Sequence, residues 1–341
     1  MNEVTIIGVD LAKRVFQAHG AAADGSVVFR KKLSRAQVLP FLERQPSCIV
    51  AMEACATAHH WGREIGKLGH EVRLIAPHYV KPFVKRQKND AADAEAIAEA
   101  ASRPTMRFVA LKSRECQARA LLFRSRDLMV RQRAQLITSL RGHLAEYGLV
   151  VARGKEQIRH LARALEDPET DLPELLRTTS RMYLEQIGAL TGRIGELDKM
   201  IRTEAARGAT SARLQNMPGI GPVSAMAIET FAPSMETFGR GRDFSAWLGL
   251  VPRQNSSGGK QVLGKTSKMG QRDIRRLLVS GAMSVIRAAS RNAPPEGSWL
   301  ARMLARKPRM LVAIALANKM ARSAWAMLTK QENYRNPAAA A

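Results

Sequence analysis

Over the first hundred residues, short apolar segments rich in β-branched side chains alternate with helical patterns, and this alternation constrains the fold more than any other feature. The first three segments follow one another directly, and Asp24-Gly25 supplies a hairpin turn between the second and the third. Helical stretches separate the remaining segments. This order predicts a mixed α/β sheet. The expected strands are residues 4–9, 15–21, 26–32, 48–52 and 72–76.

Helices are expected between these strands and through most of the remaining chain. Ser34 is interpreted as the cap of the first helix, and Gly69 as the residue that ends the second. Residues 113–147 and 173–206 predict two long helices in an antiparallel hairpin or coiled-coil arm, with an acidic turn at 166–173. A plain helical spacer and a dimerisation arm are both compatible with that pattern. The other expected helices are 34–45, 57–68, 90–101, 271–291 and 299–329.

A chain of 341 residues is long enough for two domains and a connector. The predicted division is an α/β domain at 1–108, a helical arm at 109–208, a mostly helical domain at 209–330 and a disordered tail at 331–341. The residues MNEVTIIGVD lack a basic region followed by a long apolar stretch, so no signal peptide is expected. No apolar run of about 18 residues occurs either. Cys48, Cys55 and Cys116 follow no metal or disulfide spacing, which suits a reducing cytosol. A cytoplasmic protein without a membrane segment is expected.

The net charge of the chain is strongly positive and unevenly distributed. Lys and Arg number 54 against 30 Asp and Glu, a net charge of +24, and the pI is about 10.9. Residues 209–341 contain 20 basic and 6 acidic residues. An excess of this size indicates a polyanionic partner, nucleic acid before a membrane surface, although a generally basic surface is the plainer explanation.

Four carboxylates occupy positions where a metal centre is expected. Asp10 and Glu53 each follow an apolar strand, and Asp90 and Asp93 open a helix on a shared face. Converging carboxylates repel one another unless cations neutralise them, and hard oxygen ligands suit Mg²⁺ or Mn²⁺. Each has a plainer explanation: the helix pair could complement the helix dipole, and Glu53 could begin a solvated loop. Asp10 is harder to explain in this way, because a carboxylate after a buried strand is costly without a partner.

Two glycine-containing segments of the C-terminal third are candidates for contact with phosphates. Gly219 and Gly221 form a turn before a helix, where backbone N–H groups could bind phosphate as in a helix–hairpin–helix module; a mere tight turn is the alternative. Ser256 and Ser257 precede two glycines in an exposed loop. A serine there could attack phosphorus if something activates it, and a polar turn is the plainer reading.

Two sets of motifs carry a resemblance to a known family. The start Gly8-Val9-Asp10-Leu11-Ala12-Lys13 and the segment 88–94, Lys-Asn-Asp-Ala-Ala-Asp-Ala, resemble the DEDD transposase domain of one insertion-sequence family, which has the ribonuclease-H-like (RuvC-like) nuclease fold. The stretch 244–276, with Ser-Ser-Gly-Gly at its centre, resembles the C-terminal transposase domain of the same family. The two motif sets lie in the right order, with a helical arm between them.

The resemblance implies a DNA transposase in which Asp10, Glu53, Asp90 and Asp93 are the metal ligands. It implies Ser257 as the nucleophile, with Ser256 as the neighbouring candidate, and a tetramer guided by a structured bridge RNA. Strand exchange between duplexes itself requires several active sites, so a homo-oligomer, dimer to tetramer, is expected. Residues predicted to contact nucleic acid are Lys81, Lys85, Arg86, Lys88, Gly219, Gly221, Arg253, Lys260, Lys265, Lys268, Arg272, Arg275 and Arg276.

Two other classes of function remain open. A structure-specific, Holliday-junction endonuclease would use the four carboxylates with metal-activated water, and would leave the serine loop unused. A non-catalytic nucleic-acid-binding protein would keep the carboxylates only for structure. The effect of Ser257→Ala on cleavage separates the first class from a serine transposase, and metal-independent binding without cleavage would indicate the second.

Overall fold

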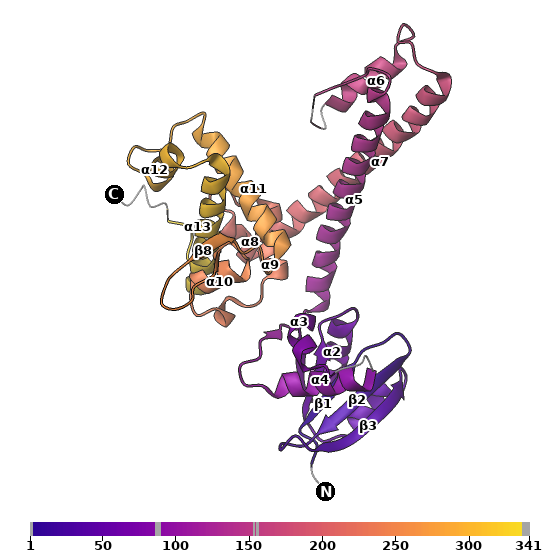
Figure 1. Cartoon of the computed structure of the whole chain (residues 1–341), viewed down its shortest axis with the longest axis vertical. Helices are drawn as coiled ribbons and strands as arrows, with labels where there is room; N and C mark the ends of the chain where they lie inside the picture. The colour runs from indigo at the N-terminus through magenta and orange to yellow at the C-terminus, as the bar shows by residue number, and fades with distance from the viewer. Residues whose placement is uncertain (1–2, 86–89, 153, 155–156, 336–341) are drawn as a thin grey trace. The chain divides into compact units, whose positions relative to one another are not determined.

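The computed structural model describes residues 3–85, 90–152, 154 and 157–335. The chain divides into two compact units, Met1–Gln117 and Ala118–Ala341 (Figure 1). The predicted phosphate contacts Arg86 and Lys88, and residues 336–341 of the predicted tail, lie outside the described residues. The further division of the second unit near residue 208, and the boundary at 108, stay predictions.

The first unit is built around a six-stranded mixed sheet with the order β3-β2-β1-β4-β5-β6. Strand β1 pairs antiparallel with β2 and β2 with β3, whereas β1, β4 and β5 run parallel. This confirms the predicted mixed α/β sheet and is compatible with a ribonuclease-H-like fold. The strands are β1 (Ile6–Asp10), β2 (Val15–Ala21), β3 (Val27–Ser34), β4 (Ile49–Glu53), β5 (Glu71–Ile75) and β6 (Phe108–Val109).

Helices cover both faces of this sheet. Successive residues of a strand point to opposite sides, and in β1 the residues on both sides are apolar and buried. Ile7 and Val9 of β1 pack in one core with α1 (Val38–Glu43) and α2 (Ala58–Lys67). Their neighbour Ile6 packs in a second core with α4 (Asp90–Ser102). Between β5 and α4 lie the short helices α3 (Pro77–Val80) and η1 (Lys81–Phe83).

The predicted start of the first helix is wrong. Ser34 is the last residue of β3, paired with Val15, and the helix begins only at Val38. The Ser34 backbone N–H donates to the Gln37 side chain at 2.9 Å, so the tight turn after the strand uses Gln37 in place of a serine cap. The strand extends further than expected because its exposed edge tolerates the basic and polar residues that precede Ser34.

The arm consists of α5 (Arg114–Ala145), α6 (Ile158–Glu166) and α7 (Glu174–Arg207) (Figure 1). The two long helices lie within one or two residues of their predicted bounds, whereas α6 was not predicted. Within the second unit, Arg126 of α5 forms an ion pair with Asp198 of α7 at 2.5 Å. The far end has a small leucine-rich core that includes Leu140, Leu144 and Leu161.

The remainder of the second unit is mainly helical around the largest apolar core of the chain. Its elements are α8 (Ala209–Leu214), α9 (Pro222–Phe231), η3 (Met235–Thr237), α10 (Gly241–Trp247), β7 (Pro252–Gln254), β8 (Leu263–Thr266), α11 (Arg272–Ala289), α12 (Trp299–Arg306) and α13 (Arg309–Lys330). The prediction of one helix at 299–329 is wrong. Lys307 is extended before Pro308, as residues before proline usually are, and the chain therefore forms two helices. Among the described residues, no helix is long and apolar enough to cross a membrane.

Candidate metal centre and serine loop

Asp10 and Glu53 are brought to one edge of the sheet by the parallel pairing of their strands. Asp10 ends β1 and Glu53 ends β4, and the register places Val9 beside Met52 immediately before them. The residues that precede both carboxylates are buried, so the two strands are held by the core up to the point where the acids emerge. Both acids are half-buried. This edge, at the carboxyl ends of parallel strands, is where open α/β sheets place their ligand sites.

Helix α4 supplies the other two carboxylates, and Gly8 permits its close approach to β1. A β-carbon at Gly8 would lie 2.2 Å from the Ala94 carbonyl oxygen and 2.7 Å from the Ala98 backbone nitrogen. Only glycine therefore fits against this helix at its observed distance from the strand. The facing residues of α4 are alanines, and Asp90 and Asp93 lie in its first turn. Sequence reasoning missed the role of Gly8, although glycine in an apolar strand is the signal for such a contact.

Three of the four predicted ligands meet. One carboxylate oxygen from each of Asp10, Asp90 and Asp93 lies within 4.8 Å of the others, with Asp90 exposed and the other two half-buried. Three negative charges so close repel one another unless a cation intervenes. The helix dipole offsets part of that repulsion at Asp90 and Asp93.

Glu53 lies beside this group and is not one of the three that meet. Its carboxyl pKa is raised, first by burial and second by the negative charge of Asp93. Glu53 ends β4 beside the end of β1, so it lies at the same edge of the sheet as Asp10. The nearby thiol of Cys55 also has a raised pKa, from burial and from the charges of Glu53 and Asp10. No pattern in the sequence had singled out Cys55.

The donor set fits a hard divalent cation. All of the donors are carboxylate oxygens, which Mg²⁺ and Mn²⁺ prefer, and the set contains no soft ligand. One oxygen of each aspartate already lies within 4.8 Å of the others, so Asp10, Asp90 and Asp93 could bind one ion together after movement of their side chains.

Lys81 and Lys85, the two predicted phosphate contacts before α4 that the structure describes, are exposed. Lys81 begins η1, and the Lys85 ammonium contacts the Glu95 carboxylate at 2.5 Å. Glu95 also pairs with Arg30 at 3.1 Å. Lys85 is therefore already partly neutralised inside the unit, and its contact with phosphate stays a prediction.

The serine loop connects β7 to β8 at the surface of the second unit. Gly258 and Gly259 have φ values of 56° and 76°, which allow the tight turn. The two serines have different environments. The Ser256 hydroxyl accepts a hydrogen bond from the Val262 backbone N–H at 3.2 Å, whereas the Ser257 hydroxyl is exposed and has no hydrogen-bond partner among the described residues.

The basic residues around this loop fall into two groups. Five are exposed and form no ion pair within the described part of the chain: Arg253, Lys260, Lys265, Lys268 and Arg272. The other two are engaged inside the unit, although Arg276 is also exposed. Arg275 donates to the backbone oxygens of Leu248 at 2.8 Å and Met269 at 3.2 Å, and burial followed by the charge of Arg272 lowers its pKa. Arg276 pairs with Asp127 at 2.6 Å. Arg275 and Arg276 thus hold the unit together, and their predicted contact with phosphate is not tested.

The glycine turn before α9 is packed on another helix. Gly219 has a φ of 87°, and a β-carbon there would lie 2.9 Å from the Gly281 carbonyl oxygen of α11. Gly221 immediately precedes α9. The helix–hairpin–helix function expected of Gly219 and Gly221 stays a prediction.

Comparison with known proteins places both regions in one family. Residues 7–149 match the DEDD transposase model of IS110, and residues 211–294 match the model described as "Transposase IS116/IS110/IS902 family". The chain is 46 % identical over 331 residues to a Pseudomonas aeruginosa protein named "Probable family 20 transposase", covering 96 % of this chain and 98 % of that one.

Two further relatives are transposases of insertion-sequence elements. The chain is 41 % identical to that of IS1328 from Yersinia enterocolitica, covering 97 % of this chain and 98 % of the relative. It is 39 % identical to that of IS1111A from Coxiella burnetii, covering 98 % and 92 %. Because identity at this level extends over nearly the full length of the chains compared, the chain belongs to the IS110/IS116/IS902 family of transposases.

Proposed function

We propose that the protein cuts and rejoins DNA strands during the movement of an insertion sequence, and that the carboxylate centre of the first unit is where it acts. The observation that carries this proposal is the meeting of Asp10, Asp90 and Asp93 within 4.8 Å. It falls inside the region that matches the DEDD transposase model. The net charge of +24 supports a DNA partner.

In this proposal the three aspartates hold a divalent metal ion and Glu53 completes the ligand set. When bound, the metal would stabilise negative charge on the oxygens of the phosphodiester being exchanged. Glu53 suits the fourth ligand position, because it ends β4 beside the end of β1 and is half-buried at the same edge of the sheet as Asp10. Gly8 acts as a positioning residue, since it sets the distance of α4 from β1.

Ser257 is proposed as the nucleophile. Its hydroxyl loses a proton and forms a bond to phosphorus, the bond from phosphorus to the leaving strand breaks, and the leaving oxygen takes up a proton as a hydroxyl. Attack by a hydroxyl of another strand reverses these changes and releases the serine, so rejoining needs no external energy. The exposure of the Ser257 hydroxyl supports this choice, while Ser256 is engaged in closing the hairpin. The resemblance of the loop to the family's serine motif is the second support.

A guide RNA and a homo-oligomer, dimer to tetramer, belong to the same proposal. The charge of the second unit, with 20 basic and 6 acidic residues over 209–341, is compatible with binding RNA as well as DNA. Strand exchange between two duplexes requires several active sites, which supports an oligomer. Size measurement of the protein with and without its co-expressed RNA tests both points.

An adduct-trapping assay tests the proposed chemistry. The full chain, purified with co-expressed RNA, is incubated with Mg²⁺ and labelled DNA of the element's ends and run on a denaturing gel. A protein–DNA adduct is expected from the wild type and from Ser256→Ala, but not from Ser257→Ala or Asp10→Asn. Asp24→Asn, a change in an exposed turn, is the matched carboxylate control.

Two other results would change the proposal in different ways. One such result is DNA cleavage that produces no adduct and that persists in Ser257→Ala. It would indicate an endonuclease that uses metal-activated water, with the carboxylate centre retained. Cleavage that persists in Asp10→Asn would contradict the carboxylate centre itself.

A further inference from the structure

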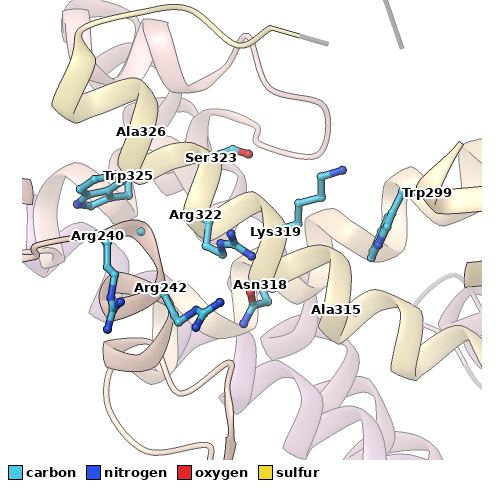
Figure 2. A pocket seen from close by; sticks show the side chains of 11 residues that line it. Arg240, Arg242, Trp299, Ala315, Asn318, Lys319, Arg322, Ser323, Trp325 and Ala326 are labelled. Atoms are coloured by element: carbon cyan, nitrogen blue, oxygen red, sulfur yellow. The ribbon is translucent and has the colours of Figure 1, made fainter. Parts of the chain in front are cut away.

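A pocket of about 740 Å³ lies in the second unit, and its lining is rich in basic and aromatic residues and contains no residue of the serine loop. Arg240 immediately precedes α10 and Arg242 lies in its first turn. Lys319 and Arg322 belong to α13 (Figure 2). Trp299 begins α12, and Trp325 belongs to α13. In the view of Figure 2 the two tryptophans stand on either side of the cationic side chains.

The periodicity of α13 explains how this lining forms. The pocket-lining residues of the helix recur at helical spacing and therefore lie along one side of it; they are Ala315, Asn318, Lys319, Arg322, Ser323, Trp325 and Ala326. The opposite face is buried in the apolar core through residues such as Ala317, Ala321 and Ala324. Small side chains next to long cations leave a hollow with charged walls.

Gly241 brings the second wall close to α13. A β-carbon at Gly241 would lie 3.0 Å from the Arg322 carbonyl oxygen and 3.2 Å from the Trp325 ring. The side chain of Trp325 is fixed, because its indole N–H donates to the backbone oxygens of Met235 and Phe238, each at 3.2 Å. Asn318 is fixed as well, by donating to the Leu250 carbonyl oxygen at 3.1 Å. The walls of the pocket are thus held by packing and hydrogen bonds before any ligand binds.

The charge of the pocket is largely uncompensated. Of the four cationic residues that line the pocket, Arg240 forms an ion pair, with Asp243 at 3.4 Å. Within the described residues, no carboxylate pairs with Arg242, Lys319 or Arg322. The lining itself contains no acidic residue. Neighbouring cations without counter-charges repel one another, so the site gains electrostatic energy when an anion binds.

Trp299 offers an aromatic surface in the same pocket. The Lys319 ammonium lies 5.1 Å from the centre of its ring, and the ring is only half-buried. Lysine is flexible, so its ammonium can exchange the ring for a phosphate and leave the ring face to a planar base. Cationic grooves with stacking aromatic side chains are how proteins bind single strands of nucleic acid.

We propose that this pocket binds an unpaired nucleotide of a single-stranded nucleic acid, with its phosphate on Arg242 and Arg322 and its base on Trp299. The volume favours a single strand over a duplex. A sphere of 740 Å³ is about 11 Å across. A B-form duplex is wider than its major groove, which is itself roughly 12 Å wide, so a whole duplex does not fit into the pocket. The pocket shares no residue with the carboxylate centre, and its proposed binding does not depend on the catalytic role of that centre.

Binding measurements in EDTA test the pocket without any contribution from metal-dependent cleavage. The full-length protein is titrated into labelled (dT)₁₂, (U)₁₂ and a 12-base-pair duplex, with anisotropy as the readout at several salt concentrations. Arg242→Gln/Arg322→Gln is expected to weaken single-strand binding about tenfold or more and to reduce the salt slope by about 0.7, because the contact with one phosphate is lost. The matched control, Arg302→Gln/Arg306→Gln, removes the same charge from α12 outside the pocket lining and is expected to change affinity less than twofold.

The aromatic contact has its own pair of variants. Trp299→Leu is expected to weaken single-strand binding roughly tenfold, whereas Trp299→Phe retains most of it because a phenyl ring still stacks. The chain has four tryptophans, and the quenching of tryptophan fluorescence by the bound strand is expected to diminish in Trp299→Phe. Circular dichroism and thermal unfolding of each variant show that the unit remains folded.

The results of these titrations distinguish a DNA strand from an RNA strand as the ligand, and they also show whether the proposal is wrong. Weakening confined to (dT)₁₂ identifies a DNA strand, weakening confined to (U)₁₂ identifies RNA, and weakening of both identifies a site for either. The proposal is overturned if the pocket variant weakens binding no more than its α12 control, or weakens duplex binding equally. Repeating the titration with Asp10→Asn keeps this result independent of the proposed catalytic function.

Discussion

Replacement of Gly8 by alanine tests the packing that brings the carboxylates together. The added β-carbon would lie 2.2 Å from the Ala94 carbonyl oxygen, 2.7 Å from the Ala98 nitrogen and 2.9 Å from the Ala98 β-carbon. Two of these three contacts are with backbone, so no side-chain rotation can relieve them. Either α4 must move away from β1 or the strand must bend.

The size of the effect follows from the contact distances. Restoring an acceptable contact with the Ala94 oxygen requires a displacement of roughly 1 Å, and forced overpacking of this kind costs about 3 kcal/mol in the free energy of unfolding. The same displacement moves Asp90 and Asp93 relative to Asp10, since the first two lie on α4 and the third on β1. Misplacement of catalytic groups by about 1 Å lowers reaction rates about 100-fold.

Gly66→Ala is the matched control, because it adds the same methyl group to the same unit. Gly66 is exposed in α2 and its nearest neighbour would be the Val72 side chain at 4.0 Å. Its replacement is expected to leave cleavage unchanged and to stabilise the unit by about 0.5 kcal/mol, since alanine favours helices. Denaturant unfolding followed by circular dichroism, together with DNA cleavage under single-turnover conditions, measures both effects. Wild-type stability and cleavage in Gly8→Ala would refute this explanation of the site.

Three further predictions concern the stability of the two units. Burial lowers the pKa of His19. The charges of Arg30 and Lys85 lower this pKa further, whereas the charge of Glu95 raises it. The folded state therefore disfavours protonation of His19. Stability should fall as the pH drops below about 6.5, where the unfolded histidine takes up a proton, and thermal unfolding at pH 7.5 and 5.5 should show a smaller difference in His19→Gln. Asp198→Asn leaves Arg126 without its charged partner and should lower stability by about 1–2 kcal/mol in denaturant unfolding; an unchanged midpoint would contradict a role for this pair. Leu144→Ala, at a fully buried position, should cost about 3 kcal/mol and speed hydrogen exchange at the far end of the arm, with exchange elsewhere unaffected.

The strands and the acids that follow them could be predicted from sequence because both depend on local patterns. The short length of apolar runs such as 48–52 and the helical patterns that flank them favour buried strands. The ends of these strands place Asp10 and Glu53 at one edge. The alanine-rich composition and first-turn aspartates of α4 also determine its bounds locally. The sequence pattern does not give the distance between β1 and α4, which depends on Gly8. It therefore does not show that the three aspartates meet while Glu53 lies outside their group.

Other features depend on contacts between residues far apart in the sequence. Ser34 has the residue type of a helix cap, but its pairing with Val15 keeps it in β3. The basic pocket also joins segments about 80 residues apart, with Arg242 on one wall and Arg322 on the other. Trp299 is the kind of residue that usually packs in a core, and only its half-exposed position in this pocket indicates a binding role. Pro308 is the exception, since the break it introduces between α12 and α13 follows from a local rule.

Binding of Mn²⁺ to the full chain tests the central claim most directly, because it measures the metal centre separately from DNA. Titration followed by electron paramagnetic resonance compares the wild type with Asp10→Asn/Asp93→Asn and with the exposed control Asp24→Asn. Mn²⁺ is expected to bind the wild type and the control alike, to be displaced by Mg²⁺, and to bind the double variant at least tenfold more weakly, with DNA cleavage lost in parallel. Equal Mn²⁺ affinity in the wild type and the double variant, or wild-type DNA cleavage in EDTA, would contradict the account.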